Sequence, residues 1–297
     1  MKIVVTGSLG HIGKPLTEAL VREGHSVIVI SQNPERQKDI VAMGAKAAVG
    51  KLEDAEFLTS TFTGADAAYC MMPISFKETD LVAYFKKIAN SYALAVRRSG
   101  MKHVVLLSGW VAGVISSYEE IENIFDELPD VAVTHIRPGY FYSNFFDSMT
   151  MIKENGLIAA TFGGDDRIVF SAPSDIADTI ANEITCQHHG TSELIAMRKV
   201  HYVASDEMTC NEAAGILGAA IGKPGMKWIS VPAEQMQKNL ESAGLSPKLA
   251  SDLVEMQSPI RDGLMPLEFA RHRSEVATGK FRLADFAREF SSVYNRR

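Results

Sequence analysis

Short apolar runs alternate with amphipathic stretches through the first half of the chain, and this rhythm constrains the fold more than any other feature. Apolar runs occur at residues 3–5, 27–30, 47–49, 67–70, 104–107 and 131–133. Such near-continuous runs are typical of strands that are buried on both faces, as in a parallel sheet. The stretches between them repeat apolar side chains at helical spacing. Because parallel neighbours need crossover connections, residues 2–137 predict an α/β fold with a doubly wound parallel sheet and helices on both faces.

A glycine-rich turn follows the first apolar run and opens the first helical stretch. Glycines at this spacing allow a sharp strand-to-helix turn, a close approach of the backbone to a pyrophosphate, and close packing of the helix on the strand. The free N–H groups and the positive dipole end of the helix then face the anion. The predicted cofactor-binding residues of this turn are Gly7, Ser8, Leu9, Gly10, His11, Ile12 and Gly13. The side chain of His11 either contacts the pyrophosphate or is solvated.

The end of the second apolar run bears on the choice between NAD and NADP. NAD sites place an Asp or Glu there for the ribose 2′-hydroxyl, whereas NADP sites avoid that charge and supply Arg. This strand end has no acidic residue, and its predicted cofactor-binding residues are Ser31, Gln32, Asn33 and Arg36. The first three can donate hydrogen bonds to a phosphate, and Arg36 either reaches that phosphate or is a solvated charge at a helix start. The segment therefore favours NADP(H) over NAD(H).

The rhythm of strands and helices breaks after Pro138-Gly139. An aromatic cluster and a glycine turn follow, and then come a helical stretch at residues 174–184 and a strand-like run at 200–204. Further helical stretches cover residues 210–221, 233–243, 247–256 and 283–294. We expect residues 1–155 to form a dinucleotide-binding domain, to which residues 165–204 return. Residues 205–297 are expected to form a smaller, mostly helical substrate domain over the ligand edge of the sheet.

Several motifs together resemble one known family. The motifs are Gly7-x-x-Gly10-x-x-Gly13, Asn33-Pro34-Glu35, Arg137-Pro138-Gly139-Tyr140-Phe141 with Asn144, and Ser174-Asp175-Ile176-Ala177. In order and spacing over residues 1–205 they resemble the NmrA-like proteins, atypical members of the short-chain dehydrogenase/reductase superfamily. The resemblance implies a Rossmann-like domain that binds NAD(P)H and a small C-terminal domain that closes over the nicotinamide. Relatives include NADPH-dependent quinone and dye reductases and catalytically silent redox-sensing regulators.

Two positions depart from the family pattern. Gln32 stands where these proteins usually have Arg, and Gly50-Lys51-Leu52 stands where many have Gly-Asp near the adenine. Two further cofactor loops carry over from the resemblance. They are Met71-Met72-Pro73 and Ser108-Gly109.

The usual catalytic pair of short-chain dehydrogenases is missing. In that pair, Tyr-x-x-x-Lys, the Lys lowers the pKa of the Tyr so that the phenol can give a proton to the substrate oxygen. None of the eight tyrosines has a Lys four residues later, and the best placed one, Tyr118, is followed at that distance by Glu122. Tyr118 is the candidate proton donor, or else an ordinary residue of a helix face. Ser108, after the fifth strand, is the second catalytic candidate, since it can touch the nicotinamide or the substrate.

Without this proton relay an ordinary ketone reductase would lose a general acid contribution of roughly 10²–10⁴-fold. A quinone, azo compound or cationic dye accepts hydride into a conjugated system, so its protonation can follow from water. The predicted substrate-binding residues are Trp110, Tyr140, Tyr142 and Asn144. Within the aromatic cluster we expect Tyr140 and Tyr142 to line the substrate pocket, and Phe141 and Phe145 to belong to the core.

Composition excludes several other classes of protein. The net charge of −6 and the absence of a Lys/Arg block argue against nucleic acid as the main partner. The longest apolar run, residues 67–72, is far shorter than the ~18 residues of a membrane helix. No signal peptide is recognisable, so we expect a cytoplasmic protein. We interpret His188-His189 beside Cys186 as a solvated helix end, and no metal site is predicted.

Two functions stay open at this stage. The first is an NADPH-dependent oxidoreductase that transfers hydride to a conjugated small molecule such as a quinone. The second is a catalytically silent NAD(P)-sensing regulator that acts through a protein partner. A homodimer is also left open.

Overall fold

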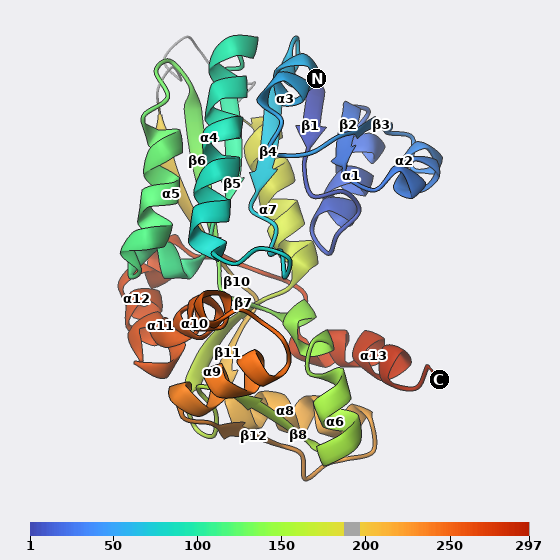
Figure 1. Cartoon of the computed structure of the whole chain (residues 1–297). Helices are drawn as coiled ribbons and strands as arrows, with labels where there is room; N and C mark the ends of the chain where they lie inside the picture. The colour runs from blue at the N-terminus through green and yellow to red at the C-terminus, as the bar shows by residue number, and fades with distance from the viewer. Residues whose placement is uncertain (187–196, 297) are drawn as a thin grey trace.

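The structure, a computed structural model, describes residues 1–186 and 197–296 (Figure 1). Within these residues eight parallel strands form the sheet of the upper lobe. The strands are β1 (Lys2–Val5), β2 (Ser26–Ser31), β3 (Lys46–Val49), β4 (Ala67–Met71), β5 (His103–Leu107), β6 (Ala132–Pro138), β10 (Arg198–Ala204) and β13 (Ala277–Thr278). Their order is β13-β10-β6-β5-β4-β1-β2-β3, and every pairing is parallel. The predicted doubly wound α/β fold is therefore confirmed.

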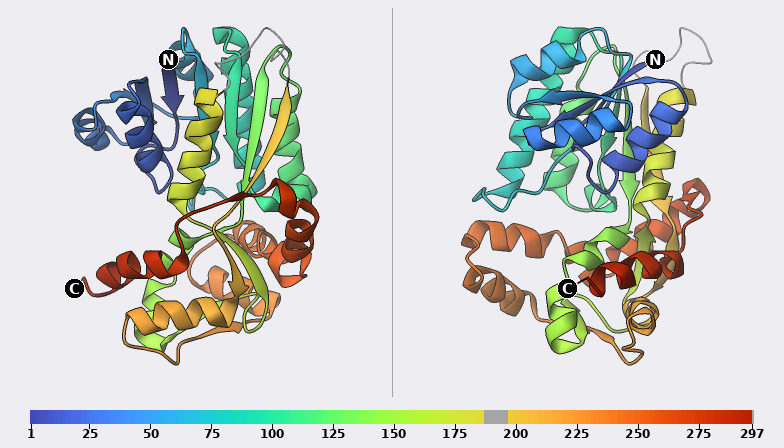
Figure 2. Two further views of the ribbon diagram at one scale, coloured as in Figure 1. Left: turned by 180° about the vertical axis from the view of Figure 1, so that it is seen from behind. Right: turned by 90° about the vertical axis from the view of Figure 1, so that its right-hand side faces the viewer.

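Helices cover both faces of this sheet; Figure 1 shows one face, and the left view of Figure 2, from behind, shows the other. One face carries α1 (Gly13–Arg22), α2 (Gln37–Ala42) and α7 (Pro173–Cys186); the other carries α3 (Ala55–Phe62), α4 (Leu81–Ser99) and α5 (Ser116–Asp126). Alternate residues of one strand enter different cores: Ile3 and Val5 pack with α1 and α7, and Val4 packs with α3 and α4. Burial on both faces explains why the strands are nearly continuous apolar runs.

The strand order reverses at β1, which pairs with β2 on one side and with β4 on the other. In open parallel sheets, ligands bind outside the carboxyl ends of the strands at such a switch point. The turn after β1 and the loop after β4 meet there, so the fold itself marks this edge as the place for a ligand.

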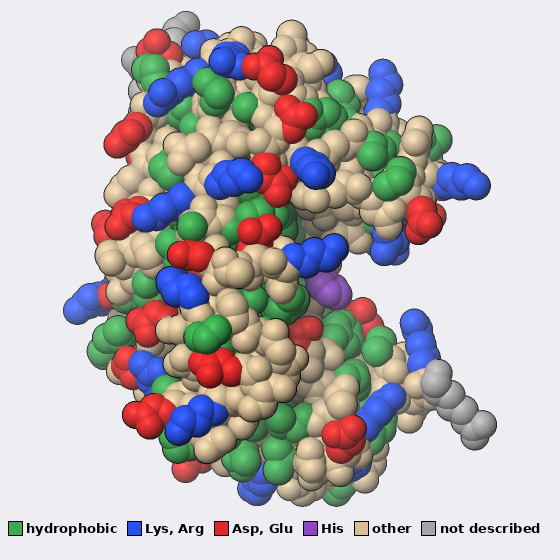
Figure 3. Space-filling view, in the orientation of Figure 1, with side chains coloured by type: hydrophobic (Ala, Val, Ile, Leu, Met, Phe, Trp, Pro, Cys, Tyr) green, Lys and Arg blue, Asp and Glu red, His purple; other side chains and the backbone are tan. Residues whose placement is uncertain are grey.

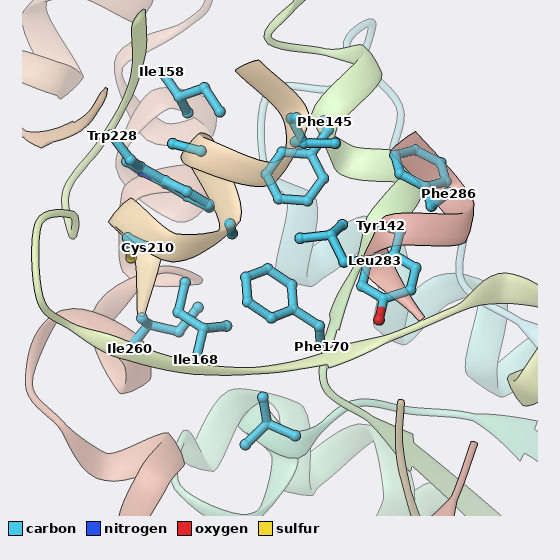
Figure 4. Packing of buried hydrophobic residues seen from close by; sticks show 14 of the residues in the cluster. Tyr142, Phe145, Ile158, Ile168, Phe170, Cys210, Trp228, Ile260, Leu283 and Phe286 are labelled. Atoms are coloured by element: carbon cyan, nitrogen blue, oxygen red, sulfur yellow. The ribbon is translucent and has the colours of Figure 1, made fainter. Parts of the chain in front are cut away.

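The lower lobe contains two small sheets. One consists of β7 (Tyr140–Phe141), β9 (Arg167–Ser171) and β11 (Asp206–Thr209), and the other of β8 (Leu157–Ala160) and β12 (Lys227–Ser230). The helical segments are η3 (Tyr142–Phe146), α6 (Met149–Asn155), α8 (Cys210–Ala220), α9 (Ala233–Ser242), α10 (Pro247–Glu255), α11 (Ser258–Arg261), α12 (Leu264–His272) and α13 (Leu283–Tyr294). Aromatic rings dominate the core of this lobe (Figure 4). Phe145 lies 5.9 Å from Phe170 and 5.5 Å from Trp228, measured between ring centroids.

The chain passes between the lobes several times, and the domain boundaries differ from the prediction. It leaves the large sheet after Pro138, earlier than the predicted boundary at residue 155, because β7 pairs with β9 in the lower lobe. Within the segment 165–204, α7 and β10 return to the large sheet but β9 does not. The short strand β13, which lies in the predicted substrate domain, pairs with β10 at the edge of the large sheet.

Between the lobes the surface is hollowed into a cleft, visible at the right of Figure 3. The turn between β1 and α1 hangs over the cleft from above, and η3, α6 and α13 lie below it (Figure 1). In the described part of the chain, no helix combines the length and apolar character needed to cross a bilayer.

Candidate active site

The turn from β1 to α1 is shaped by bare backbone. Gly7 adopts φ +83°, and a Cβ at that residue would lie 3.0 Å from Met71 Cγ. A Cβ on Gly13 would lie only 2.3 Å from the carbonyl oxygen of Ser8, which no side chain tolerates. In this described segment, α1 has neither a side-chain cap at its N-terminus nor an acidic residue in its first turn. The uncapped start of α1 and the helix dipole therefore suit an anion such as the pyrophosphate of a dinucleotide.

The other residues of the turn surround this backbone. Ser8 also has a positive φ, +56°, and Leu9 packs against the core beneath the sheet. Ile12 is buried, whereas Gly10 and His11 are exposed. The His11 ring stacks on Phe146 of η3 with 5.9 Å between centroids, so this turn touches the lower lobe.

The end of β2 is tied to the glycine turn by Ser31. Its hydroxyl lies 3.0 Å from Ser8 Oγ and 3.1 Å from both the N and O atoms of Asn33, and Ser31 is 2% exposed. Ser31 is predicted from sequence to donate to a 2′-phosphate, but the structure commits its hydroxyl to these neighbours. The side-chain oxygen of Asn33 accepts from the N–H of Glu35 at 2.9 Å and so caps η1 (Pro34–Arg36).

Gln32 and Arg36 are exposed at the end of β2, as are Asn33 and Glu35. Arg36 lies 3.5 Å from Asp39, a distance at which an exposed pair is weak. Gln32 hydrogen bonds to Tyr84 of α4; burial and then Glu53 raise the pKa of Tyr84 to about 12. Tyr84 and Glu53 are not predicted as site residues, because nothing in the local sequence pattern shows that α4 and the loop after β3 reach the end of β2.

A network of charged and polar side chains occupies the opposite end of the edge, after β5 and β6. Ser108 Oγ donates to Glu122 Oε1 at 2.5 Å. Arg137 donates to both Glu122 oxygens, from Nε at 3.0 Å and from Nη2 at 2.5 Å, and its Nη1 donates to the Tyr202 hydroxyl at 3.2 Å. Burial alone would lower the pKa of Arg137, but the hydrogen bonds and charge of Glu122 outweigh it and raise that pKa above its usual value. The guanidinium therefore stays charged.

Tyr118 does not join this network. Its ring lies edge-on to Phe85 at 6.2 Å, and its buried hydroxyl has no hydrogen-bond partner among the described residues. Burial, followed by the charge of Asp252, raises the pKa of Tyr118 far above its usual value, so the phenol stays protonated. The helical position four residues later, where a Lys would activate the phenol, holds Glu122. This carboxylate pairs with Arg137.

The loop after β4 brings Met71, Met72 and Pro73 to the cleft as half-buried residues. Further along this loop Ile74 and Phe76 are 47% and 69% exposed. The loop ends at α4, where the N–H of Leu81 donates to Asp252 of α10 at 3.0 Å and so ties the upper lobe to the lower one. Ser108 and Gly109 are half-buried in the same manner at the end of β5.

Two of the four predicted substrate residues, Trp110 and Tyr142, are buried in the lower core, whereas Tyr140 and Asn144 are half-buried. Tyr142 is fully buried, and its hydroxyl donates to Asp206 at 2.5 Å. The Tyr140 ring stands edge-on to Phe170 at 5.9 Å, and its hydroxyl hydrogen bonds to the half-buried Asn144. Trp110, in η2 (Trp110–Gly113), is 2% exposed and packs 4.9 Å from Tyr202.

Side chains alternate along β7, so Tyr140 packs against the lower core and its neighbour Phe141 packs against the core between the large sheet and helices α1 and α7. Phe141, predicted to be core, is half-buried, whereas Phe146 of the same aromatic cluster stacks on His11 of the glycine turn. Phe145 is buried, as predicted.

The described residues contain no group of His, Cys, Asp and Glu arranged to hold a metal ion. Cys186 is exposed at the end of α7, and His188 and His189 lie outside the described residues.

Comparisons with known proteins agree with this geometry. A model of the NmrA-like family matches residues 1–265. Over 69 residues the chain is 35% identical to a 4-hydroxy-2-methyl-3-oxo-4-farnesyl-3,4-dihydroquinoline-1-oxide ketoreductase of Stigmatella aurantiaca, a stretch that covers 23% of this chain and 21% of that relative. The chain thus matches only about a fifth of the length of this curated relative.

Two solved structures share the whole architecture. The NADPH-dependent quinone oxidoreductase QOR2 of Escherichia coli, in complex with NADPH, has a TM-score of 0.76 and 20% identity, with 99% of this chain and 100% of that chain covered. The triphenylmethane reductase of Citrobacter sp., in complex with NADP(H), has a TM-score of 0.73 and 19% identity, with 97% and 99% covered. At these identities the likeness shows a common fold. Because the family model extends from the first strand to the start of α12, this chain belongs to the NmrA-like family.

Proposed function

We propose that this protein is an NADPH-dependent oxidoreductase that reduces a conjugated small molecule such as a quinone. The observation that carries the proposal is the glycine turn, whose contacts leave no room for side chains at Gly7 and Gly13 but leave backbone amides available to a pyrophosphate. Both solved relatives described above were crystallised with NADPH or NADP(H). The bound nicotinamide would supply the hydride.

The preference for NADPH rests on the exposed polar residues at the end of β2. Gln32 and Arg36 can donate hydrogen bonds to a 2′-phosphate, and the strand end carries no carboxylate that would repel it. Asn33 can contribute its side-chain amide N–H, because its oxygen already caps η1. The hydroxyl of Ser31 instead keeps the β2 end and the glycine turn together.

The proposed class of hydride acceptor follows from the state of the candidate proton donor, Tyr118. The Tyr118 phenol stays protonated and has Glu122 rather than a lysine four residues later, so it lacks the lysine that activates a Tyr-x-x-x-Lys pair. A conjugated hydride acceptor depends less on a general acid, because the added charge is delocalised or neutralised and water can protonate the product. Face-to-face positioning of cofactor and acceptor can then supply several kcal/mol of the barrier reduction. Met71, Met72, Pro73, Ser108 and Gly109 are the proposed contacts on the nicotinamide side.

The test is oxidation of NADPH by the purified protein with a panel of quinones and cationic dyes, followed by the loss of absorbance of the reduced nicotinamide. We expect turnover with at least one conjugated acceptor. Saturable NADPH binding with no turnover on the whole panel would contradict the enzyme.

That outcome would favour the second candidate, a regulator that binds NAD(P) and acts on a protein partner. The unpaired Tyr118 hydroxyl is the observation in favour of a silent site. A partner protein whose affinity for this chain changes with the bound dinucleotide would support this candidate. The failure to find such a partner would contradict it.

A further inference from the structure

Glu122 accepts hydrogen bonds from two segments of the chain. It is 4% exposed on α5, and it accepts from Ser108 and from two nitrogens of Arg137. Arg137 also donates to Tyr202, so the network extends away from the cleft toward β10. Ser108 is its one member that stands at the end of β5, on the cofactor edge.

The direction of the Ser108 hydrogen bond follows from these partners. A guanidinium can only donate hydrogen bonds. The guanidinium of Arg137 contacts both oxygens of Glu122, which favours the ionised carboxylate. An ionised carboxylate has no hydrogen of its own, so the hydrogen in the 2.5 Å contact belongs to Ser108. The length is that of an O–H donor on a charged acceptor, roughly 2.5–2.7 Å. Only the lone pairs of Ser108 are then left for a ligand.

We propose that Glu122 is a positioning residue that holds Ser108 as a hydrogen-bond acceptor and thereby selects against simple ketones and aldehydes. The inference rests on the proposed oxidoreductase function and narrows its substrate class. A hydroxyl that stabilises a developing oxyanion has to donate its hydrogen to it. Ser108 cannot do so while Glu122 holds that hydrogen.

The electron balance shows which acceptors the arrangement tolerates. When a reduced nicotinamide gives hydride to the carbon of a ketone, the C=O π pair moves to the oxygen, the nicotinamide is oxidised, and the alkoxide takes a proton from water. The Ser108 lone pairs would face that alkoxide and repel it. A cationic conjugated acceptor takes the same hydride and becomes neutral without any proton. A quinone spreads the charge over its conjugated system before water protonates the oxygen.

The first test is Ser108→Ala in the full-length protein, assayed with NADPH and with both an aliphatic ketone and a quinone. We expect the ratio of kcat/KM for the ketone to that for the quinone to fall by no more than about threefold, because no donor to the ketone oxygen is lost. A serine that donates to the ketone oxygen would instead lower this ratio by roughly 10²–10³-fold on truncation. A loss of that size would overturn the inference.

The second test is Glu122→Gln, read as the ratio of kcat/KM for an aliphatic ketone to that for the quinone. A glutamine can keep its oxygen on Arg137 and turn its N–H₂ toward Ser108, which frees the serine hydrogen for the substrate. We expect the ratio to rise at least about tenfold. The matched control is Glu183→Gln, a carboxylate that is equally buried, at 6% exposed, and held by Lys199, His201 and Thr134 away from the cleft. Glu183→Gln should leave the ratio unchanged, and an unchanged ratio in Glu122→Gln would contradict the proposal.

A readout without turnover separates this inference from the proposed function. A neutron structure of the protein, exchanged into heavy water, should show deuterium on Ser108 Oγ directed at Glu122. Deuterium on Glu122 directed at Ser108 would overturn the inference even if the protein reduces quinones. A protein that shows the expected deuterium but oxidises no NADPH would contradict the proposed function alone. The same structure decides the case if Glu122→Gln does not fold.

Discussion

The two halves of the cofactor edge are built in different ways. At β1 and β2 the site is mostly backbone, shaped by Gly7 and Gly13 and closed by one serine pair. At β5 and β6 it is a network of side chains that come from residues 108, 122, 137 and 202. The first half requires glycines, because a Cβ atom would clash with the neighbouring backbone. The second half requires the side chains of the network to be present together, because each one satisfies the hydrogen bonds of another.

The largest expected effect on cofactor binding tests the backbone half. Gly13→Ala places a methyl group 2.3 Å from the Ser8 carbonyl, so the turn must shift and the amides move out of position. We expect NADPH affinity to fall by at least about 10²-fold, since a helix-terminus anion site depends on the placement of those amides. Calorimetric titration measures it.

The control is Gly215→Ala on α8, where nothing lies within 4 Å of the added Cβ. It should leave NADPH affinity unchanged and stabilise the protein by about 0.5–1 kcal/mol, as alanine usually does in a helix. Equal effects of the two variants on NADPH affinity would contradict the explanation that the turn binds the cofactor because residue 13 has no Cβ atom.

The side-chain half is tested by Glu122→Ala. This change leaves Arg137 buried without its carboxylate, and breaking a buried pair in this way costs about 3–5 kcal/mol of unfolding free energy. Glu120, on the same helix α5, pairs with Lys86 at the surface, with both side chains substantially exposed. Glu120→Ala should cost no more than about 1 kcal/mol. Urea unfolding of both variants measures the difference, and comparable losses would contradict the distinction.

A smaller effect is expected from Gln32→Asp at the β2 end. The new carboxylate suits a ribose 2′-hydroxyl and repels a 2′-phosphate. We expect the ratio of NADPH to NADH affinity to fall about tenfold or more, equivalent to about 1.4 kcal/mol. Titration with both reduced cofactors measures it. Gln32→Asn, which adds no charge, is the matched control, and an equal shift in that variant would count against the electrostatic explanation.

The smallest effect concerns a carboxylate outside both halves. Burial alone would raise the pKa of Glu183, but hydrogen bonds from His201, Lys199 and Thr134 outweigh it and hold that pKa well below its usual value. The unfolded chain then binds a proton near pH 4, whereas the folded chain does not, so stability falls as the pH drops below about 4. In Glu183→Gln this part of the acid dependence should disappear in urea unfolding between pH 3 and pH 7. A curve parallel to wild type would show that the acid sensitivity comes from other carboxylates.

These two halves also differ in how far the sequence predicts them. The glycine turn and the strands up to β5 follow from local periodicity and spacing, and the structure contains them. The place of Ser108 after a strand predicts it as a site residue. Nothing in the sequence predicts the link from Ser108 through Glu122 to Arg137, because this link exists only when β5, α5 and β6 pack together.

The prediction for the aromatic cluster is wrong at Tyr142 for another reason. Tyr142 is fully buried, and Asp206 accepts the hydrogen of its hydroxyl inside the lower lobe. The hydroxyl of the half-buried Tyr140 hydrogen bonds to Asn144. Which face of β7 points at the cleft depends on its pairing with β9, which the sequence does not reveal. Phe141, on the other face of β7, packs against the core beside α1 and α7.

Calorimetric titration of the wild-type protein with NADPH and with NADH tests the central claim most directly. We predict saturable binding of NADPH, weaker binding of NADH, and loss of both in Gly13→Ala. A wild-type protein that binds neither nucleotide at saturating concentration would contradict the account.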